Sequence, residues 1–113
     1  MAAAFEHEYA EAYLCAFTGD DSPWIEARAL FPNSGIPEDP ATGSTAGPLA
    51  AYMARVGRLR FGERRVVLQG ARIGRPSHLT VAVEGGPDGI ADVLVGGRVF
   101  PVLRGELDLP DRA

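Results

Sequence analysis

The segment GIPEDPATGSTAGPLAAYMARVG, residues 35–57, places small and hydroxyl-bearing residues directly before a stretch with helical periodicity. The first backbone amides of a helix have no partner inside it, and the peptide dipoles leave that end partly positive. Gly43 has no side chain that would keep a ligand away from those amides, while Ser44 and Thr45 add hydroxyl groups. The segment therefore predicts a binding site for a carboxylate or a phosphate.

An acidic side chain precedes this helix start by a few residues. Asp39 lies between Pro37 and Pro40, which restrict the backbone around it. A carboxylate aimed at the same small volume as the helix amides could pass a proton to or from a bound ligand. The same residues also allow a purely structural interpretation, in which Asp39 or Thr42 caps the loop, Ser44 caps the helix and nothing binds.

Size and composition narrow the class of protein. The chain has 113 residues, enough for one domain with its own core, and its 46% apolar and 23% charged residues are typical of a globular protein. The net charge of -4 argues against a nucleic-acid partner, and we interpret the arginines between residues 55 and 65 as a solvated helix end and turn. No apolar run approaches the ~20 residues that span a bilayer, and the N-terminus lacks the regions of a signal peptide. With Cys15 as the single cysteine, we expect a cytoplasmic protein that does not enter a membrane.

Other chemically suggestive residues have the wrong spacing for a site. Glu6, His7 and Glu8 are adjacent, so they do not face one another on a helix, and a strand sends His7 opposite to both acids. The run GSTAGPL lacks the Gly-Lys-Ser/Thr ending of a phosphate-binding loop. His78 is one side chain of a predicted strand, where we expect a surface residue. The residues therefore indicate no metal site.

Hydrophobic periodicity predicts a single α+β domain over residues 1–113. The expected elements are a frayed or helical lead-in at 1–11, strands at 12–18 and 24–31, a helix at 46–56, and short period-two strands within 64–71, 77–85 and 91–109. The GGPDG run at 85–89 is the clearest hairpin signal. This order favours a mostly antiparallel, curved sheet wrapped around one central helix.

The predicted helix carries an apolar face and two boundary signals. Pro48 is tolerated within a first turn, which predicts a helix start just before it, and Gly57 is a natural stop. The residues expected to share the buried face are Leu49, Tyr52, Met53 and Val56.

The run FPNSGIPEDPATGSTAGPLAAYM closely resembles the signature of the phenazine-biosynthesis PhzF-like isomerase family. The likeness continues through LQGARIGRPSHLTVAVEG and VLVGGRVFPVLRGEL, so it covers roughly residues 12–109. The resemblance implies a diaminopimelate epimerase-like fold, in which two pseudo-symmetric halves each curl a mostly antiparallel sheet around a central helix. The active site of that fold lies between the halves, where both helix N-termini point at one substrate.

Carried over by motif, the resemblance implies that Asp39 is the acidic site residue of the second half. We therefore expect Asp39 and Ser44 to be catalytic, and Gly43, Ser44 and Thr45 to bind the substrate. The family's chemistry is isomerisation or epimerisation of a small carboxylic acid by proton transfer, with no metal, nucleotide or other cofactor. The GRPS motif, residues 74–77, is expected to form a structural turn.

The resemblance covers only the second half of family members, which are more than twice as long. Their principal general base, a glutamate, belongs to the first half, and no segment of this chain resembles that region. We therefore expect an isomerase component that needs a separate N-terminal-half protein or a homodimer, in which Asp39 of each copy faces the other. A dimer would leave an apolar flank exposed on the monomer. The alternative is a catalytically inactive small-acid-binding or structural remnant.

Overall fold

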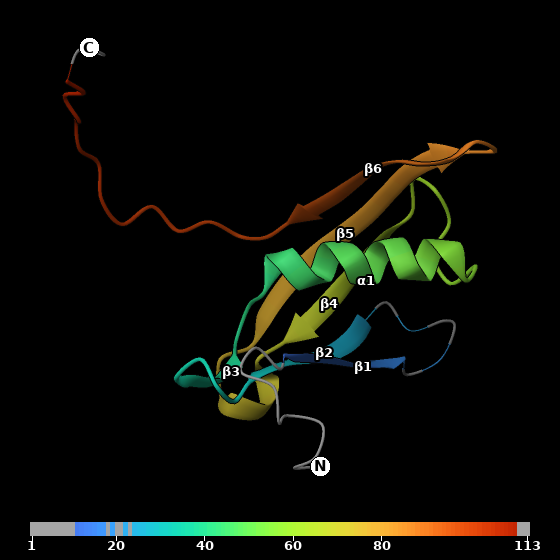
Figure 1. Ribbon diagram of the computed structural model, residues 1–113, viewed down its shortest axis with the longest axis horizontal. Helices are drawn as coiled ribbons and strands as arrows, with labels where there is room; N and C mark the ends of the chain where they lie inside the picture. The colour runs from blue at the N-terminus through green and yellow to red at the C-terminus, as the bar shows by residue number, and fades with distance from the viewer. Residues whose placement is uncertain (1–10, 18, 20–21, 23, 111–113) are drawn as a thin grey trace.

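The computed structural model describes residues 11–17, 19, 22 and 24–110, so all of the expected lead-in except residue 11 lies outside it. The elements are β1 (Ala12–Phe17), β2 (Trp24–Phe31), β3 (Ile36–Asp39), α1 (Gly43–Arg55), β4 (Arg64–Gln69), the short 3-10 helix η2 (Ala71–Ile73), β5 (Ser77–Gly86) and β6 (Gly89–Gly96). The strands form one sheet in the order β1-β2-β4-β5-β6, with β3 also paired to β2. The single long helix lies along this sheet (Figure 1), which confirms the expected α+β architecture.

The sheet is antiparallel at every described pairing except one. Residues 24–27 of β2 run parallel to residues 66–69 of β4. Parallel neighbours need a connection that crosses back over the sheet, and the chain between β2 and β4 contains α1. The predicted hairpin at residues 85–89 is confirmed, because β5 and β6 pair antiparallel with Gly86 opposite Gly89.

The core lies between α1 and the sheet. Ile25 of β2, Met53 of α1, Val67 of β4 and Val81 of β5 are fully buried there. A Cβ on Gly47 would lie 3.5 Å from Val95 Cγ2, so the helix backbone comes close to β6 at this point. The predicted helix face is wrong in part, because Tyr52 and Val56 are exposed whereas Ala46, Gly47, Leu49, Ala50 and Met53 are buried.

The helix begins three residues earlier than expected, at Gly43 rather than Ala46. The expected start relied on Pro48 lying in the first turn, but Pro48 occupies the second turn. A proline there lacks the N–H that would bond the carbonyl four residues earlier, which belongs to Ser44. Ser44 and Pro48 are both exposed, so water can satisfy that carbonyl and the helix tolerates the proline.

Two further segments differ from expectation. The short strand β3 was expected to be loop, since its sequence IPED holds a proline and no apolar alternation. Conversely, the strand pattern within residues 91–109 forms only β6, and residues 97–110 have no regular structure. These last residues extend away from the sheet and α1 (Figure 1).

The burial of Met53 yields a stability prediction. Met53→Ala should lower the free energy of unfolding by about 2–5 kcal/mol, because it leaves a cavity in a closed core. Tyr52→Ala, at the adjacent exposed position, should change that free energy by only about 0.5 kcal/mol. Urea titration of both variants measures the difference. Equal losses would show that the helix does not pack on the face described here.

Candidate functional site

Asp39 closes the turn between β3 and α1. Its Oδ2 accepts a hydrogen bond from Thr42 Oγ1 at 2.6 Å, and its Oδ1 accepts one from the Ala41 amide at 3.5 Å. The carboxylate therefore ties the chain entering the helix back to the end of β3. Of the structural roles that the sequence left open, the turn-capping role of Asp39 is present. Ser44 is not the helix cap, because α1 begins at Gly43 and Thr42 occupies the N-cap position, without a side-chain capping bond.

The first amides of α1 follow directly after this turn. The amides of Thr45 and Ala46 donate to the Thr42 carbonyl at 3.3 and 3.1 Å. Within the described part of the chain, the amides of Gly43 and Ser44 have no acceptor, and both residues are exposed. The positive end of the helix dipole thus carries unpaired N–H groups on exposed residues, directly after the turn that Asp39 closes.

The hydroxyl groups of the helix start differ in their surroundings. Thr45 Oγ1 donates to the Thr42 carbonyl at 3.0 Å, so the hydroxyl of this predicted binding residue is already used by the backbone. The side chain of Ser44 makes no hydrogen bond to the described residues and is exposed. Asp39, Gly43 and Ser44 therefore meet at one corner of the fold, and Thr45 supports that corner from inside.

A residue that sequence reasoning missed, Gln69, holds this corner together. Its side chain is fully buried at the end of β4. Its Nε2 donates to the Asp39 carbonyl at 2.7 Å and to Thr42 Oγ1 at 2.8 Å, while its Oε1 accepts from the Thr42 amide at 3.3 Å. A signal was present in the sequence, because Gln69 shares the core-facing side of its strand with Val67. A polar residue on an apolar face requires buried partners.

Tyr13 completes the hydrogen bonding of this glutamine from β1. Its hydroxyl donates to Gln69 Oε1 at 2.9 Å. Burial raises the pKa of the Tyr13 phenol to about 12, so the hydroxyl keeps its proton and remains a donor at neutral pH. Two donated and two accepted hydrogen bonds satisfy a side-chain amide in full. The network fixes which way Gln69 points, and through it the position of the Asp39 turn.

The turn after β4 packs directly against this corner. Gly70 has φ of 75°, and a Cβ there would meet the Arg75 carbonyl oxygen and lie 2.8 Å from Pro40 Cα. Only glycine permits that approach. The Arg75 amide donates to the Gly70 carbonyl at 3.0 Å, and Gly74 has φ of 72°. The turn thus spans residues 70–75, so the structural turn expected at residues 74–77 is present at Gly74, whereas Ser77 already begins β5.

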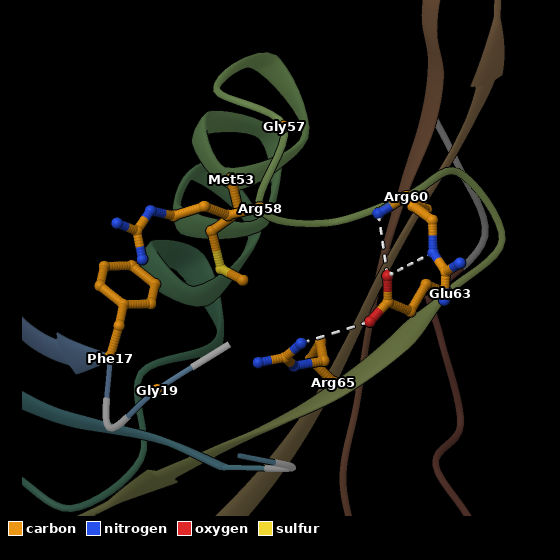
Figure 2. Close-up of a pocket in the computed structure, with 8 residues that line it drawn as sticks. All are labelled: Phe17, Gly19, Met53, Gly57, Arg58, Arg60, Glu63 and Arg65. Carbon is orange, nitrogen blue, oxygen red and sulfur yellow. Dashed lines mark hydrogen bonds and ion pairs between the residues drawn. The ribbon is translucent and has the colours of Figure 1, made fainter. Parts of the chain in front are cut away.

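A separate hollow of about 340 Å³ lies beyond the C-terminal end of α1 and is lined by none of the predicted site residues. Figure 2 shows how its charged side chains are arranged. The Arg58 guanidinium lies over the Phe17 ring, 4.8 Å from the centroid, and Glu63 pairs with Arg60 at 3.4 Å and with Arg65 at 3.3 Å. Since α1 has 13 residues, this hollow lies roughly 20 Å from the helix start.

The described residues contain neither a cluster of metal-ligating side chains nor a helix that could span a membrane. No three His, Cys, Asp or Glu side chains among them come together as a possible metal site. None of their helices is both long enough and apolar enough to cross a membrane.

The family described as "Phenazine biosynthesis-like protein" matches residues 7–105 of the sequence. The chain belongs to this family. The match confirms the resemblance found in the sequence, including its extent over most of the chain.

Named relatives of this phenazine biosynthesis-like chain are isomerases. It is 42% identical over 93 residues to a trans-2,3-dihydro-3-hydroxyanthranilate isomerase of Pseudomonas chlororaphis, covering 82% of this chain and 33% of the relative. It is 42% identical over 74 residues to an uncharacterised isomerase of Deinococcus radiodurans, covering 63% and 24%. A solved structure of a predicted epimerase from Pseudomonas aeruginosa matches with TM-score 0.59 and 42% identity over 85% of this chain and 31% of that one. The chain thus spans between about a quarter and a third of the length of these proteins.

The buried network around Gln69 predicts graded effects of mutation. Gln69→Leu should lower the free energy of unfolding by about 1–3 kcal/mol for each buried group left unpaired, since the Thr42 amide and the Asp39 carbonyl both lose their partner. Tyr13→Phe removes one hydrogen bond and should cost only about 1 kcal/mol. Urea titration gives the free energies, and hydrogen exchange at the Thr42 amide should speed up in Gln69→Leu. A Gln69→Leu protein as stable as Tyr13→Phe would contradict the role given to the network.

Proposed function

We propose that this chain supplies the Asp39 side of a cofactor-independent isomerase or epimerase that transfers a proton on a small carboxylic acid. One observation carries the proposal: the unpaired amides of Gly43 and Ser44 open beside the Asp39 carboxylate in a member of an isomerase family. A cytoplasmic location, inferred from composition, belongs to the same proposal.

The local geometry suggests how the roles are divided. The amides of Gly43 and Ser44, at the positive end of α1, would hold the carboxylate of the substrate. The exposed hydroxyl of Ser44 would give that carboxylate a further donor. Asp39 would then take a proton from a substrate carbon, or return one to it. The hydrogen bond from Thr42 keeps its carboxylate facing the same corner.

Proton transfer of this kind needs a second group on the opposite side of the substrate. A corner open to solvent excludes water on one side only, and an isomerisation both removes and returns a proton. The missing group would come from a separate N-terminal-half protein, or from Asp39 of a second copy across a two-fold axis. Support for a partner comes from the large apolar side chains of residues 99–109, which the isolated chain leaves exposed.

A second candidate function is supported by the bonding of Asp39 itself. Both of its carboxylate oxygens accept hydrogen bonds from the turn, as they would in a purely structural role. In that case the chain is an inactive module that holds a small acid on the amides of Gly43 and Ser44. The two functions differ in one measurable respect, which is whether a bound acid exchanges protons with solvent.

Asp39→Asn tests the catalytic proposal. The named activity of the relatives makes trans-2,3-dihydro-3-hydroxyanthranilate the substrate to try, with the two thirds of the P. chlororaphis isomerase that this chain does not match supplied as partner. Deuterium uptake from heavy water into that acid should fall by about 100-fold or more in Asp39→Asn, because the proton acceptor is gone. Binding of the acid should stay within about threefold, because the helix amides are unchanged.

Glu38→Gln is the matched control, since Glu38 is the neighbouring carboxylate but pairs with Arg28 at 2.7 Å instead of facing the helix start. Its deuterium uptake should equal that of the unmodified chain. Equal uptake in Asp39→Asn and Glu38→Gln would remove Asp39 from the mechanism. Binding without uptake in the unmodified chain would establish the inactive module.

A further inference from the structure

The hollow beyond the C-terminal end of α1 brings three arginines together in a chain whose net charge is -4. Arg58, Arg60 and Arg65 line this hollow, and Glu63 is the one acid among its described lining residues. The sequence predicted a solvated helix end and turn for these arginines, and the exposed Arg58 and Arg60 agree with that prediction. The prediction is wrong for Arg65, whose side chain is only 15% exposed. The described lining residues therefore carry more positive than negative charge.

The carboxylate of Glu63 is already shared between two of these arginines. Its Oε2 accepts hydrogen bonds from the Arg60 amide at 3.0 Å and from Arg60 Nε at 3.4 Å, and its Oε1 accepts one from Arg65 Nη1 at 3.3 Å. The hydrogen bond from the Arg60 amide, together with the nearby guanidinium groups, holds the pKa of Glu63 below its ordinary value, so this carboxylate stays charged at neutral pH. Both oxygens are engaged, and Glu63 does not pair with Arg58 (Figure 2).

The guanidinium of Arg58 makes no hydrogen bond and no ion pair within the described part of the chain. It lies over the Phe17 ring, 4.8 Å from the ring centroid (Figure 2). An aromatic face attracts a guanidinium electrostatically and does not use its N–H groups as a hydrogen-bond acceptor would. The contact with Phe17 therefore positions the charge of Arg58 and leaves its donors available to an acceptor in the hollow.

The guanidinium of Arg65 is held from two sides but is not fully satisfied. Its Nη2 donates to the Ser22 carbonyl at 2.8 Å, and its Nη1 donates to Glu63. Its Nε is buried and has no hydrogen-bond partner. Unpaired buried donors are uncommon in folded proteins, because burial removes the water that would otherwise accept from them. Arg65 thus has a donor for which the described chain supplies no acceptor.

We propose that the hollow lined by Phe17, Arg58 and Arg65 binds a small molecule that carries an oxyanion, either a phosphate or a carboxylate group. The guanidinium groups of Arg58 and Arg65 donate charge-assisted hydrogen bonds to the anionic oxygens. The Phe17 ring gives the rest of the molecule an apolar wall. The volume of about 340 Å³ falls within the range of small-molecule sites. The site lies at the opposite end of α1 from Asp39, so it does not rest on the proposed function.

The C-terminal end of α1 opposes an anion, because the peptide dipoles leave that end partly negative. Three of its last carbonyls, those of Tyr52, Met53 and Ala54, accept hydrogen bonds from the amides of residues 56–59 and are not left unpaired. An exposed helix end changes the affinity for a charge by about fivefold at most. A hydrogen bond to a charged group changes the affinity by about tenfold or more. Two guanidinium groups therefore outweigh the helix dipole.

The experiment titrates inorganic phosphate, and separately citrate, into the full chain at constant ionic strength. Binding is followed by NMR at the Nε–H groups of Arg58 and Arg65, because a bulk measurement would also count any anion held by the helix start. Both signals should shift and saturate with one affinity. Tighter binding of phosphate assigns the site to phosphorylated molecules, and tighter binding of citrate assigns it to carboxylic acids.

Arg58→Gln removes the unpaired guanidinium from an exposed position, so the fold should be retained. The affinity measured at Arg65 Nε should fall by about tenfold or more, because a charge-assisted hydrogen bond is lost. Arg64→Gln is the matched control, since it removes the same charge from an exposed residue of β4 that does not line the hollow. Its affinity should stay within about twofold of the unmodified chain, because salt screens an exposed charge outside the site.

Three results would overturn the proposal. The first is the absence of a saturating shift at Arg58 and Arg65 with either anion. The second is an equal loss of affinity in Arg58→Gln and Arg64→Gln, which would mean that the anions follow the general surface charge. The third is binding that appears only in Asp20→Asn with Asp21→Asn. These two acids adjoin Gly19 in sequence, and that result would show that the chain's own carboxylates satisfy the arginines.

The backbone amides of Gly43 and Ser44 separate this site from the proposed function in the same titration. Shifts at these amides without shifts at Arg58 and Arg65 end the proposal for the hollow alone. Shifts at the two arginines without shifts at the amides end anion binding at the helix start alone.

Discussion

The buried side-chain amide of Gln69 joins three parts of the chain that are distant in sequence. Tyr13 reaches it from β1, it lies at the end of β4, and it binds both ends of the Asp39–Thr42 turn. An unpaired side-chain amide in a closed core would cost free energy. The hydrogen bonds of Gln69 therefore hold β1, the end of β4 and the Asp39–Thr42 turn together. The position of the helix start, and hence of its free amides, depends on this glutamine as well as on the hydrogen bonds within the turn itself.

The resulting corner combines opposite charges without neutralising them. Asp39 is held by Thr42 and Ala41, so its carboxylate does not fold onto the amides of Gly43 and Ser44. Those amides therefore remain unpaired, although the negative side chain of Asp39 closes the turn directly before them. The chain brings unpaired helix amides and a carboxylate to one place, and under the proposed function a partner supplies the opposite wall.

Local features of the sequence predicted most of the fold and part of the site. An apolar run located β1 and alternation located β2, with β2 matching residues 24–31 throughout. Asp39, Gly43 and Ser44 were predicted together because they lie within a few residues of one another. Gln69 was missed because its partner Thr42 lies 27 residues away, and local patterns do not report such pairings. The period-two pattern within residues 91–109 predicted strands, but residues 97–109 form none, because a strand also needs a neighbour to pair with.

The parallel pairing of β2 with β4 bears on which parts of the domain can change during evolution. Because α1 is the return path between two parallel strands, its first turn is held at the edge of the sheet where β4 finishes with Gln69. Residues added to or lost from the helix would displace its far end, where residues 56–63 connect it to β4. That connection is mostly exposed and can absorb changes in length. The domain therefore separates a fixed end, which carries the acid and the amides, from a variable end that can diverge without disturbing them.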